Sequence, residues 1–254
     1  MKIKIISSGS KANCTLVSCG STNLLIDVGQ TASFVISELE KENINPKEIS
    51  GVIITHTHSD HIKGLKVFIK STNANVYITE DLLPDIIKIV PPQNIKLIDE
   101  TLKINDINIE LLKMSHDVPC YGILINYHNK ELAYITDTGY VNKKYLSKLI
   151  NKDIYIMETN YNEKMLMEGP YPYTLKQRIL SDSGHMSNKY AGNLLSKCIG
   201  EKTKHVILAH ISEHNNCKEL VLEEVKEELK EINFDENKLI LTEQNTASEM
   251  IDVW

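Results

Sequence analysis

The segment Thr55-His-Thr-His-Ser-Asp-His61 directly follows an apolar run that is expected to be a β-strand. His56 and His58 are two residues apart, so their side chains point to the same face of an extended chain. Asp60 and His61 fall where apolar residues begin to recur at helical spacing, which predicts the start of a helix. The segment therefore presents two ligand sets in different directions. Surface histidines on a polar loop are the alternative, but HxHxDH at a strand end is far more specific than a lone HxH, so we expect a metal site with two ions.

The chain has 254 residues, of which 42% are hydrophobic, and this is enough to bury a sizeable core. No repeat, low-complexity tract or linker interrupts it, so a single domain over residues 1–254 is expected. The net charge of -6 argues against the broad basic surface of sequence-independent DNA binders. Nucleic acid is still possible as a partner, because bound divalent cations can be the largest local charges in a site.

Five cysteines are scattered along the chain and never form a CxxC pair. This pattern favours a reducing environment over a disulfide framework or a zinc ribbon. The N-terminal residues lack the apolar stretch of a signal peptide, and no apolar run approaches the length of a membrane span. We therefore expect a cytoplasmic protein without membrane insertion, whose oligomeric state the sequence leaves open.

Strands and helices are expected in two groups. The expected strands cover 3–6, 15–18, 24–26, 76–78, 95–98, 102–104, 107–113, 122–126, 132–135, 154–157, 206–209 and 239–241. The expected helices cover 31–42, the segment after the histidine cluster, 81 to the prolines at 91 and 92, 143–150, 173–180, 188–198 and the segment around 222–232. Because each group of strands is flanked by helices, we predict an α+β fold in which two mixed sheets pack face to face with helices outside.

Three more candidate ligands follow predicted strands. His116 comes after the strand that ends near residue 113, Asp137 after the strand at 132–135, and His210 after the strand at 206–209. One edge of a sheet can gather side chains that lie at strand ends. The three residues therefore complete a plausible coordination set.

With these residues in order, the chain resembles the metallo-β-lactamase-fold hydrolases. The resemblance implies a four-layer αββα sandwich and assigns the metal ligands position by position. His56, His58 and His116 would bind the first metal; Asp60, His61 and His210 would bind the second; and Asp137 would bridge them. Asp27 matches the aspartate that braces the histidine loop in this family, and a helix cap or a turn residue is the alternative.

Several segments narrow the resemblance to the YycJ (WalJ) group of bacterial proteins, which are regarded as nucleases. They are Ser8-Gly-Ser-Lys-Ala-Asn-Cys14, His56-Thr-His-Ser-Asp-His-Ile-Lys-Gly64, Glu158-Thr-Asn-Tyr161, Gly169-Pro-Tyr-Pro172, Ile179-Leu-Ser-Asp-Ser-Gly-His-Met-Ser-Asn188 and Leu208-Ala-His-Ile-Ser212. Ser183-Gly-His185-Met-Ser187 is also similar to the SGHxS motif of ribonuclease J-type nucleases, and Glu158-Thr-Asn160 to their acidic motif. The chain has no room for the cap domain of those enzymes, which puts a long RNA-clamping channel in doubt.

The resemblance implies Asp60, His185 and Glu158 as catalytic residues, with Glu158 supporting a ligand histidine. It also implies substrate contacts from Ser183, Ser187 and Asn160. Arg178 is a further candidate for a substrate contact, because it is the single arginine of a lysine-rich chain and a guanidinium can bind a phosphate with two donors. For His185 the alternative is a surface residue that precedes a helix capped by Ser187 or Asn188. For Arg178 the alternative is a packed or salt-bridged arginine on its helix.

The implied chemistry is hydrolysis by a hydroxide that two divalent metal ions activate. Zinc and manganese both suit a set of nitrogen and oxygen ligands, and iron is possible. We expect a metal-dependent phosphodiesterase that acts as a nuclease of the DNA exonuclease kind, with DNA favoured over RNA. The alternatives are a thioester or small cyclic phosphodiester hydrolase and, least favoured, a binding module without catalysis.

Overall fold

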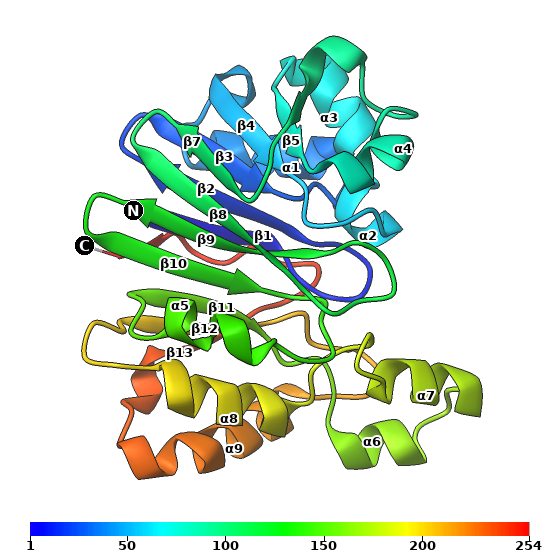
Figure 1. The fold of residues 1–254 in the computed structure, drawn as a ribbon, viewed down its shortest axis with the longest axis vertical. Coiled ribbons are helices and arrows are strands. Elements are labelled where there is room, and N and C mark those ends of the chain that lie inside the picture. Colours follow the sequence, from blue (N-terminus) through cyan, green and yellow to red (C-terminus); the bar gives the residue numbers. More distant parts are fainter. Residues whose placement is uncertain (254) are drawn as a thin grey trace. The chain divides into compact units, whose positions relative to one another are not determined.

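The computed structural model describes residues 1–253, which fall into two compact units (Figure 1). Unit 1 comprises Met1–Leu111, Ile125–Asn129 and the residues from Glu243 onward, and unit 2 comprises Leu112–Leu124 and Lys130–Thr242. The expectation of one domain over residues 1–254 stays a prediction.

The first sheet belongs to unit 1 and has seven strands in the order β14-β1-β2-β3-β4-β5-β6. These strands are β1 (Lys2–Ser7), β2 (Cys14–Cys19), β3 (Thr22–Ile26), β4 (Ile49–Ile53), β5 (Val76–Ile78), β6 (Ile95–Leu97) and β14 (Ile251–Asp252). The pairs from β3 to β6 are parallel, whereas β1 pairs antiparallel with both β2 and β14. The carboxyl ends of β3 and β4 therefore meet at the same edge of the sheet.

The helices of unit 1 are short, and α1 and α3 each bury the apolar residues of one face. They are α1 (Ala32–Lys41), α2 (Ser59–Ile62), α3 (Leu65–Thr72) and α4 (Leu83–Ile86), with 3-10 turns at Pro46–Glu48, Glu80–Leu82 and Pro92–Asn94. Val35 and Leu39 of α1 and Phe68 of α3 are fully buried, and α1 contacts α3. Each such side chain contributes about 1.5–3 kcal/mol to stability on burial.

The single helix expected after the histidine cluster is wrong in detail, because the chain breaks at Gly64 into α2 and α3. A Cβ atom at Gly64 would lie only 1.9 Å from the backbone oxygen of Gln30. The Gly64 N–H donates to the Val28 carbonyl over 2.9 Å instead of continuing α2. This close backbone approach holds the segment that contains the histidine cluster, residues 55–61, against the end of β3.

The second sheet also has seven strands, in the order β13-β12-β11-β10-β9-β8-β7. They are β7 (Thr101–Ile104), β8 (Ile107–Lys113), β9 (Tyr121–Tyr127), β10 (Lys130–Ile135), β11 (Ile154–Glu158), β12 (His205–Ala209) and β13 (Leu239–Leu241). The run from β10 to β13 is parallel, and β7 pairs antiparallel with β8. The prediction of two mixed sheets is therefore confirmed. Among the strands within residues 1–253, only the two-residue strand β14 falls neither on a predicted strand nor on the apolar run before the histidines.

Unit 2 carries the helices α5 (Leu146–Leu149), α6 (Glu163–Glu168), α7 (Tyr173–Leu180), α8 (Asn188–Cys198) and α9 (Lys218–Leu229), with 3-10 turns at Lys143–Tyr145, Lys230–Ile232 and Glu236–Lys238. Leu194 of α8 and Val225 of α9 share one buried cluster with Met157 of β11 and Leu208 of β12. The α8–α9 pair therefore covers one face of the parallel strands (Figure 1). Helix α6, which the sequence did not predict, packs with α7 in a separate small cluster that contains Leu166 and Ile179.

None of the helices within residues 1–253 combines the length and the apolar character needed to cross a bilayer.

The five cysteines differ sharply in exposure, and this predicts their reactivity. Cys14, Cys19, Cys120 and Cys198 are buried, while Cys217 is half-buried. Burial raises the pKa of the Cys19 and Cys198 thiols to about 11, so little reactive thiolate forms at neutral pH. We expect one fast-reacting thiol in the native protein, measured with a chromogenic disulfide reagent, and five after denaturation. The fast phase should vanish in Cys217→Ser; its persistence would show that a buried cysteine is accessible.

Candidate metal centre

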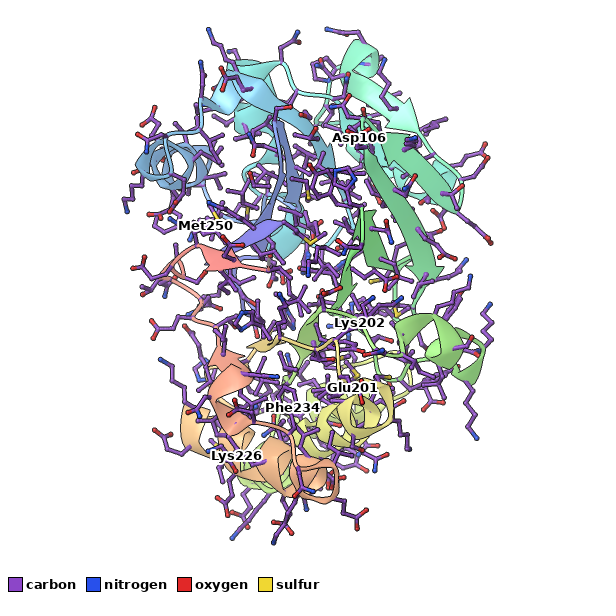
Figure 2. The ribbon with its side chains drawn as sticks, turned by 90° about the vertical axis from the view of Figure 1, so that its left-hand side faces the viewer. Asp106, Glu201, Lys202, Lys226, Phe234 and Met250 are labelled. Carbon is purple, nitrogen blue, oxygen red and sulfur yellow. The ribbon has the colours of Figure 1, made fainter. Side chains whose placement is uncertain are left out.

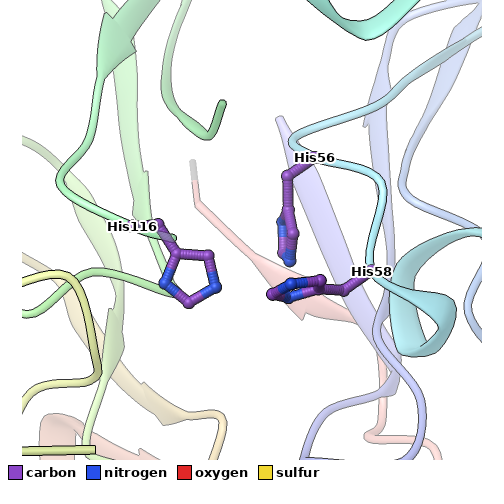
Figure 3. Close-up of side chains that lie close together, drawn as sticks. All are labelled: His56, His58 and His116. Atoms are coloured by element: carbon purple, nitrogen blue, oxygen red, sulfur yellow. The ribbon is translucent and has the colours of Figure 1, made fainter. Parts of the chain in front are cut away.

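The segment between β4 and α2 places two imidazoles side by side in unit 1. Figure 3 draws His56 and His58 on this segment, with ring centroids 4.8 Å apart and planes at 81° to each other. His56 is fully buried and also lies 4.0 Å from His61, measured between ring centroids. The His58 ring and the His61 ring, which comes from the first turn of α2, therefore both lie beside the His56 ring.

Asp27 braces this segment from the end of the neighbouring strand. Because β3 and β4 run parallel, Asp27 and Thr55 come to the same edge of the sheet. The Thr55 N–H and hydroxyl both donate to the Asp27 carboxylate over 2.8 Å, and His61 Nδ1 lies 2.7 Å from Asp27 Oδ2. Burial raises the pKa of Asp27, and the His61 imidazole opposes this only in part. A carboxylate on one ring nitrogen orients the other nitrogen of a ligand histidine towards a metal.

Asn13 is a further member of this group, to which the sequence assigned no role. Its Nδ2 lies 3.1 Å from Asp60 Oδ2 and 2.9 Å from His61 Nε2. Its backbone N–H also donates to the Asp60 carbonyl over 2.8 Å. The turn that joins β1 and β2 thus fixes both candidate ligands of α2. In the sequence, Asn13 stood out only as part of the segment Ser8–Cys14 that resembles the YycJ group.

Replacing Asp27 by Asn is expected to weaken metal binding without unfolding the chain. The amide has nearly the shape of the carboxylate but cannot accept the Thr55 and His61 bonds together, so the His61 ring loses its fixed orientation. Loss of such an outer partner costs about 10- to 100-fold in metal affinity. The affinity is measured by competition with a chromogenic chelator, and circular dichroism checks the fold. Wild-type affinity in a folded Asp27→Asn protein would contradict the bracing role.

The second set of candidate ligands lies at the ends of three parallel strands of unit 2. Asp137 follows β10, Glu158 is the last residue of β11, and His210 follows β12. Asp137 and His210 adopt left-handed backbone conformations with φ of 57° and 55°, and Asp27 does the same in unit 1 with φ of 59°. Non-glycine residues take this conformation infrequently, and the surrounding structure has to hold them in it. Three strands that carry predicted site residues thus end in the same uncommon way.

Glu158 joins two imidazoles within this set. Its Oε1 atom lies 2.6 Å from His185 Nδ1 and 3.1 Å from His210 Nδ1, while Oε2 accepts from the Thr138 N–H over 3.0 Å. Burial raises the pKa of Glu158, but the charge and hydrogen bond of His185 outweigh this, so the pKa is lowered. The buried carboxylate therefore stays charged and holds both rings by their Nδ1 atoms.

His116, also drawn in Figure 3, lies in unit 2 after β8. Its Nδ1 is 3.2 Å from the Gly184 carbonyl, which fixes the ring from the loop that precedes His185. A Cβ at Gly184 would lie 2.2 Å from the Ile179 carbonyl, so only glycine fits there. Burial lowers the pKa of His116, and the Asp137 charge opposes this in part. A neutral imidazole is the form that binds a metal.

The four predicted substrate-contact residues divide by burial. Asn160 is buried, and its Nδ2 donates to the His210 carbonyl over 3.0 Å. Ser187 is buried and caps α8 by accepting from the Tyr190 N–H. Ser183 is half-buried. Arg178 is 53% exposed, and its Nε donates to Asp117 over 2.8 Å.

The donors present fit a divalent metal. In unit 2, Asp137, Glu158, His185 and His210 each offer a ligand atom, and these atoms lie within 4.8 Å of one another. In unit 1, His56, His58, Asp60 and His61 supply three imidazoles and a carboxylate from one short segment. Nitrogen and oxygen donors without thiolates suit zinc, manganese or iron.

Two relatives match the chain along most of its length. It is 34% identical over 241 residues to exodeoxyribonuclease YycJ of Bacillus anthracis, with 92% of this chain and 91% of the relative covered. It is 33% identical over 229 residues to exodeoxyribonuclease WalJ of Streptococcus pneumoniae serotype 2, strain D39, with coverage of 86% and 84%.

Solved structures show the same fold at lower identity. The metallo-β-lactamase fold protein YhfI of Bacillus subtilis superposes with a TM-score of 0.74 at 19% identity, covering 97% of this chain and 98% of the other. The short form of human tRNase Z gives 0.68 at 15% identity, with 98% of each chain covered. Residues 22–211 match the family model described as the beta-lactamase superfamily domain. The chain therefore belongs to the beta-lactamase superfamily and, within it, to the family of metallo-β-lactamase-fold hydrolases that contains YycJ and WalJ.

Proposed function

We propose that this protein is a metal-dependent phosphodiesterase that acts as a nuclease, and that it removes nucleotides from DNA ends. The names of the YycJ and WalJ relatives support DNA as the substrate and exonucleolytic action. The free cysteines support work in the cytoplasm, where thiols stay reduced.

We further propose that two divalent cations, zinc or manganese with iron possible, are bound by the seven predicted ligands. These ligands are His56, His58, Asp60, His61, His116, Asp137 and His210. When bound, such cations supply an activated water at neutral pH and neutralise charge on a phosphodiester. Asp27, Asn13 and Asn160 keep the ligand side chains in place.

The observation that carries the proposal is the pair of imidazoles on Glu158. The two rings differ in exposure: the His185 side chain is 20% exposed, while that of His210 is 2% exposed. His210 thus suits a buried metal ligand, and His185 suits a group that reaches the substrate. Because Glu158 engages His185 Nδ1, the Nε2 atom is the one that protonates the leaving oxygen or binds the phosphate.

Ser183 and Arg178 are accessible to solvent and are proposed to contact the phosphate beside His185. For Arg178 this requires an exchange of its Asp117 partner for the substrate. The substrate contacts of Asn160 and Ser187 stay predictions, since both side chains already hold parts of the protein.

End-labelled single- and double-stranded DNA and RNA, incubated with protein loaded with manganese or zinc, test the proposal. The expected result is metal-dependent shortening of DNA from an end, absent from Asp60→Ala. Internal cleavage would overturn the exonuclease assignment, and cleavage of RNA alone would overturn the DNA assignment. Turnover of thioesters or small cyclic phosphodiesters without oligonucleotide cleavage would favour the alternative enzyme, and inertness on every substrate would favour a binding module.

A further inference from the structure

Two buried asparagines of unit 2 form a reciprocal pair of amides. Asn188, the first residue of α8, donates from Nδ2 to Asn216 Oδ1 over 3.0 Å, and Asn216 donates from Nδ2 to Asn188 Oδ1 over 2.8 Å. Asn188 is fully buried and Asn216 is 5% exposed. Each amide supplies a donor and an acceptor to the other, so neither can rotate without leaving a buried polar atom unpaired. The two side chains are therefore held in one relative orientation.

Asn216 is also bonded to the backbone that follows Glu158. Its Nδ2 atom donates to the Thr159 carbonyl over 3.0 Å and to the Asn160 carbonyl over 3.1 Å. These are the first two carbonyls after Glu158, the last residue of β11. Asn216 Oδ1 accepts in addition from the Cys217 N–H over 3.1 Å. The amide of Asn216 is thus fixed against the carboxyl end of β11.

The segment that carries His185 runs beside the same strand end. The Asn160 N–H donates to the Met186 carbonyl over 3.0 Å, and the Asn188 N–H donates to the Tyr161 carbonyl over 3.0 Å. Met186 directly follows His185, and Asn188 comes three residues after it. The backbone on the C-terminal side of His185 is therefore attached to the residues that follow β11.

The amide pair consequently joins the segments that carry the two partners of one short hydrogen bond. Glu158 Oε1 and His185 Nδ1 lie 2.6 Å apart, and they come from the end of β11 and from the loop before α8. The position of one partner relative to the other depends on how the two backbones are held together. Asn188 and Asn216 supply that connection with side chains that are buried behind the imidazole.

We propose that Asn188 and Asn216 are positioning residues for His185. The amide pair holds the His185 loop against the end of β11, so that Glu158 keeps its hydrogen bond with Nδ1 and the orientation of Nε2 stays fixed. A carboxylate only accepts, so Nδ1 carries the proton of this bond. The inference rests on the proposed nuclease function and adds the residues that align its proton donor.

The variant Asn188→Asp tests this, because it keeps the shape of the side chain and replaces its donor by an oxygen. The new carboxylate faces Asn216 Oδ1 and Glu224 of α9, which in the native protein accepts from Asn188 Nδ2 over 2.9 Å. Both contacts become repulsive, so the start of α8 should shift away from β11. We expect kcat for DNA to fall by about 10- to 100-fold, since a misplacement of about 1 Å can cost that much. KM and metal content should stay at their wild-type values.

Asn193→Asp is the matched control. Asn193 is an exposed residue of the same helix, and its Nδ2 atom donates to Glu228 of α9 over 3.3 Å. The substitution makes the same chemical change beside a glutamate of α9 but leaves the amide pair intact. Its kcat for DNA should match that of the wild type. If Asn188→Asp does not fold, Asn188→Ser removes the same donor without adding a charge.

The double variant His185→Ala/Asn188→Asp distinguishes positioning from a general structural role. If Asn188 acts through His185, the second substitution should leave the kcat of His185→Ala unchanged. Losses that multiply would show that Asn188 supports turnover by another route and would overturn the inference. A wild-type kcat in folded Asn188→Asp or Asn188→Ser would overturn it as well.

A measurement without turnover separates this inference from the proposed function. The proton that His185 Nδ1 shares with Glu158 should give a downfield proton NMR resonance, assigned by its absence from His185→Ala. We expect this resonance in the wild type and in Asn193→Asp, and we expect it to be shifted or lost in Asn188→Asp. An unchanged resonance in Asn188→Asp would overturn the positioning role. If the resonance responds as expected but the wild type cleaves no phosphodiester, the nuclease function fails while the positioning role stands.

Discussion

Replacing Asp60 by Ala is expected to abolish DNA turnover together with most metal retention. Asp60 is a predicted ligand whose carboxylate lies 3.4 Å from His61 Nε2 and accepts from Asn13. Its removal leaves His56, His58 and His61 without the one carboxylate that the segment 55–61 contains. Since loss of a supporting group alone costs about 10- to 100-fold in metal affinity, loss of a direct ligand should exceed 100-fold. Metal content after dialysis, measured by mass spectrometry, and turnover of end-labelled DNA check this.

Asp106→Ala is a matched control, because it removes an exposed carboxylate of the same unit in the turn between β7 and β8 (Figure 2). It should keep wild-type metal content and turnover. An Asp60→Ala protein that is folded, retains its metal and cleaves DNA would remove Asp60 from both the ligand set and the mechanism.

The His185→Ala variant is expected to keep its metal and lose turnover. His185 is hydrogen-bonded to Glu158 and is more exposed than His210, the other imidazole on Glu158. The substitution therefore removes a proton donor and a phosphate contact, while the His210 side chain stays in position. General acid catalysis contributes about 10²- to 10⁴-fold, and we expect kcat to fall by that factor. Turnover kinetics and metal analysis on the same preparation separate the two effects.

A second substrate sharpens the assignment of His185. A phosphodiester with a p-nitrophenyl leaving group needs little protonation, so His185→Ala should lose much less rate with it than with DNA. His128→Ala, at the turn between β9 and β10, should behave as the wild type with both substrates. Equal losses with both substrates would exclude the proton donor and leave phosphate binding, whereas metal loss in His185→Ala would make this residue a ligand.

The strand ends of the candidate site were predictable because parallel pairing obeys a simple rule. Asp137 and His210 each follow an apolar run that predicts a strand. Parallel strands bring their carboxyl ends to the same edge of the sheet. The position of Asp27 at the end of the predicted strand 24–26 could be predicted from the sequence in the same way. Its contact with Thr55 could not, because it depends on the register of β3 against β4.

Contacts between distant segments account for what the sequence did not predict. Asn13 reaches Asp60 across 47 residues of chain, and no local pattern encodes such a contact. The break at Gly64 between α2 and α3 comes from the close approach of the Gln30 backbone, which a helical pattern in the sequence cannot reveal. An arginine can bind a phosphate or form an ion pair, and the sequence does not distinguish these two roles for Arg178. In the structure Arg178 pairs with Asp117.

Titration of metal-free protein with manganese or zinc, while DNA end-shortening is followed, tests the central claim most directly. The claim is that the ligand sets around His56 and Asp137 bind the metal that makes this chain a nuclease. The predicted result is no turnover without metal, a rise that levels off near two equivalents, and no rise in Asp60→Ala at any metal concentration. Turnover by the metal-free protein, or a metal response in Asp60→Ala equal to that of the wild type, would contradict the claim.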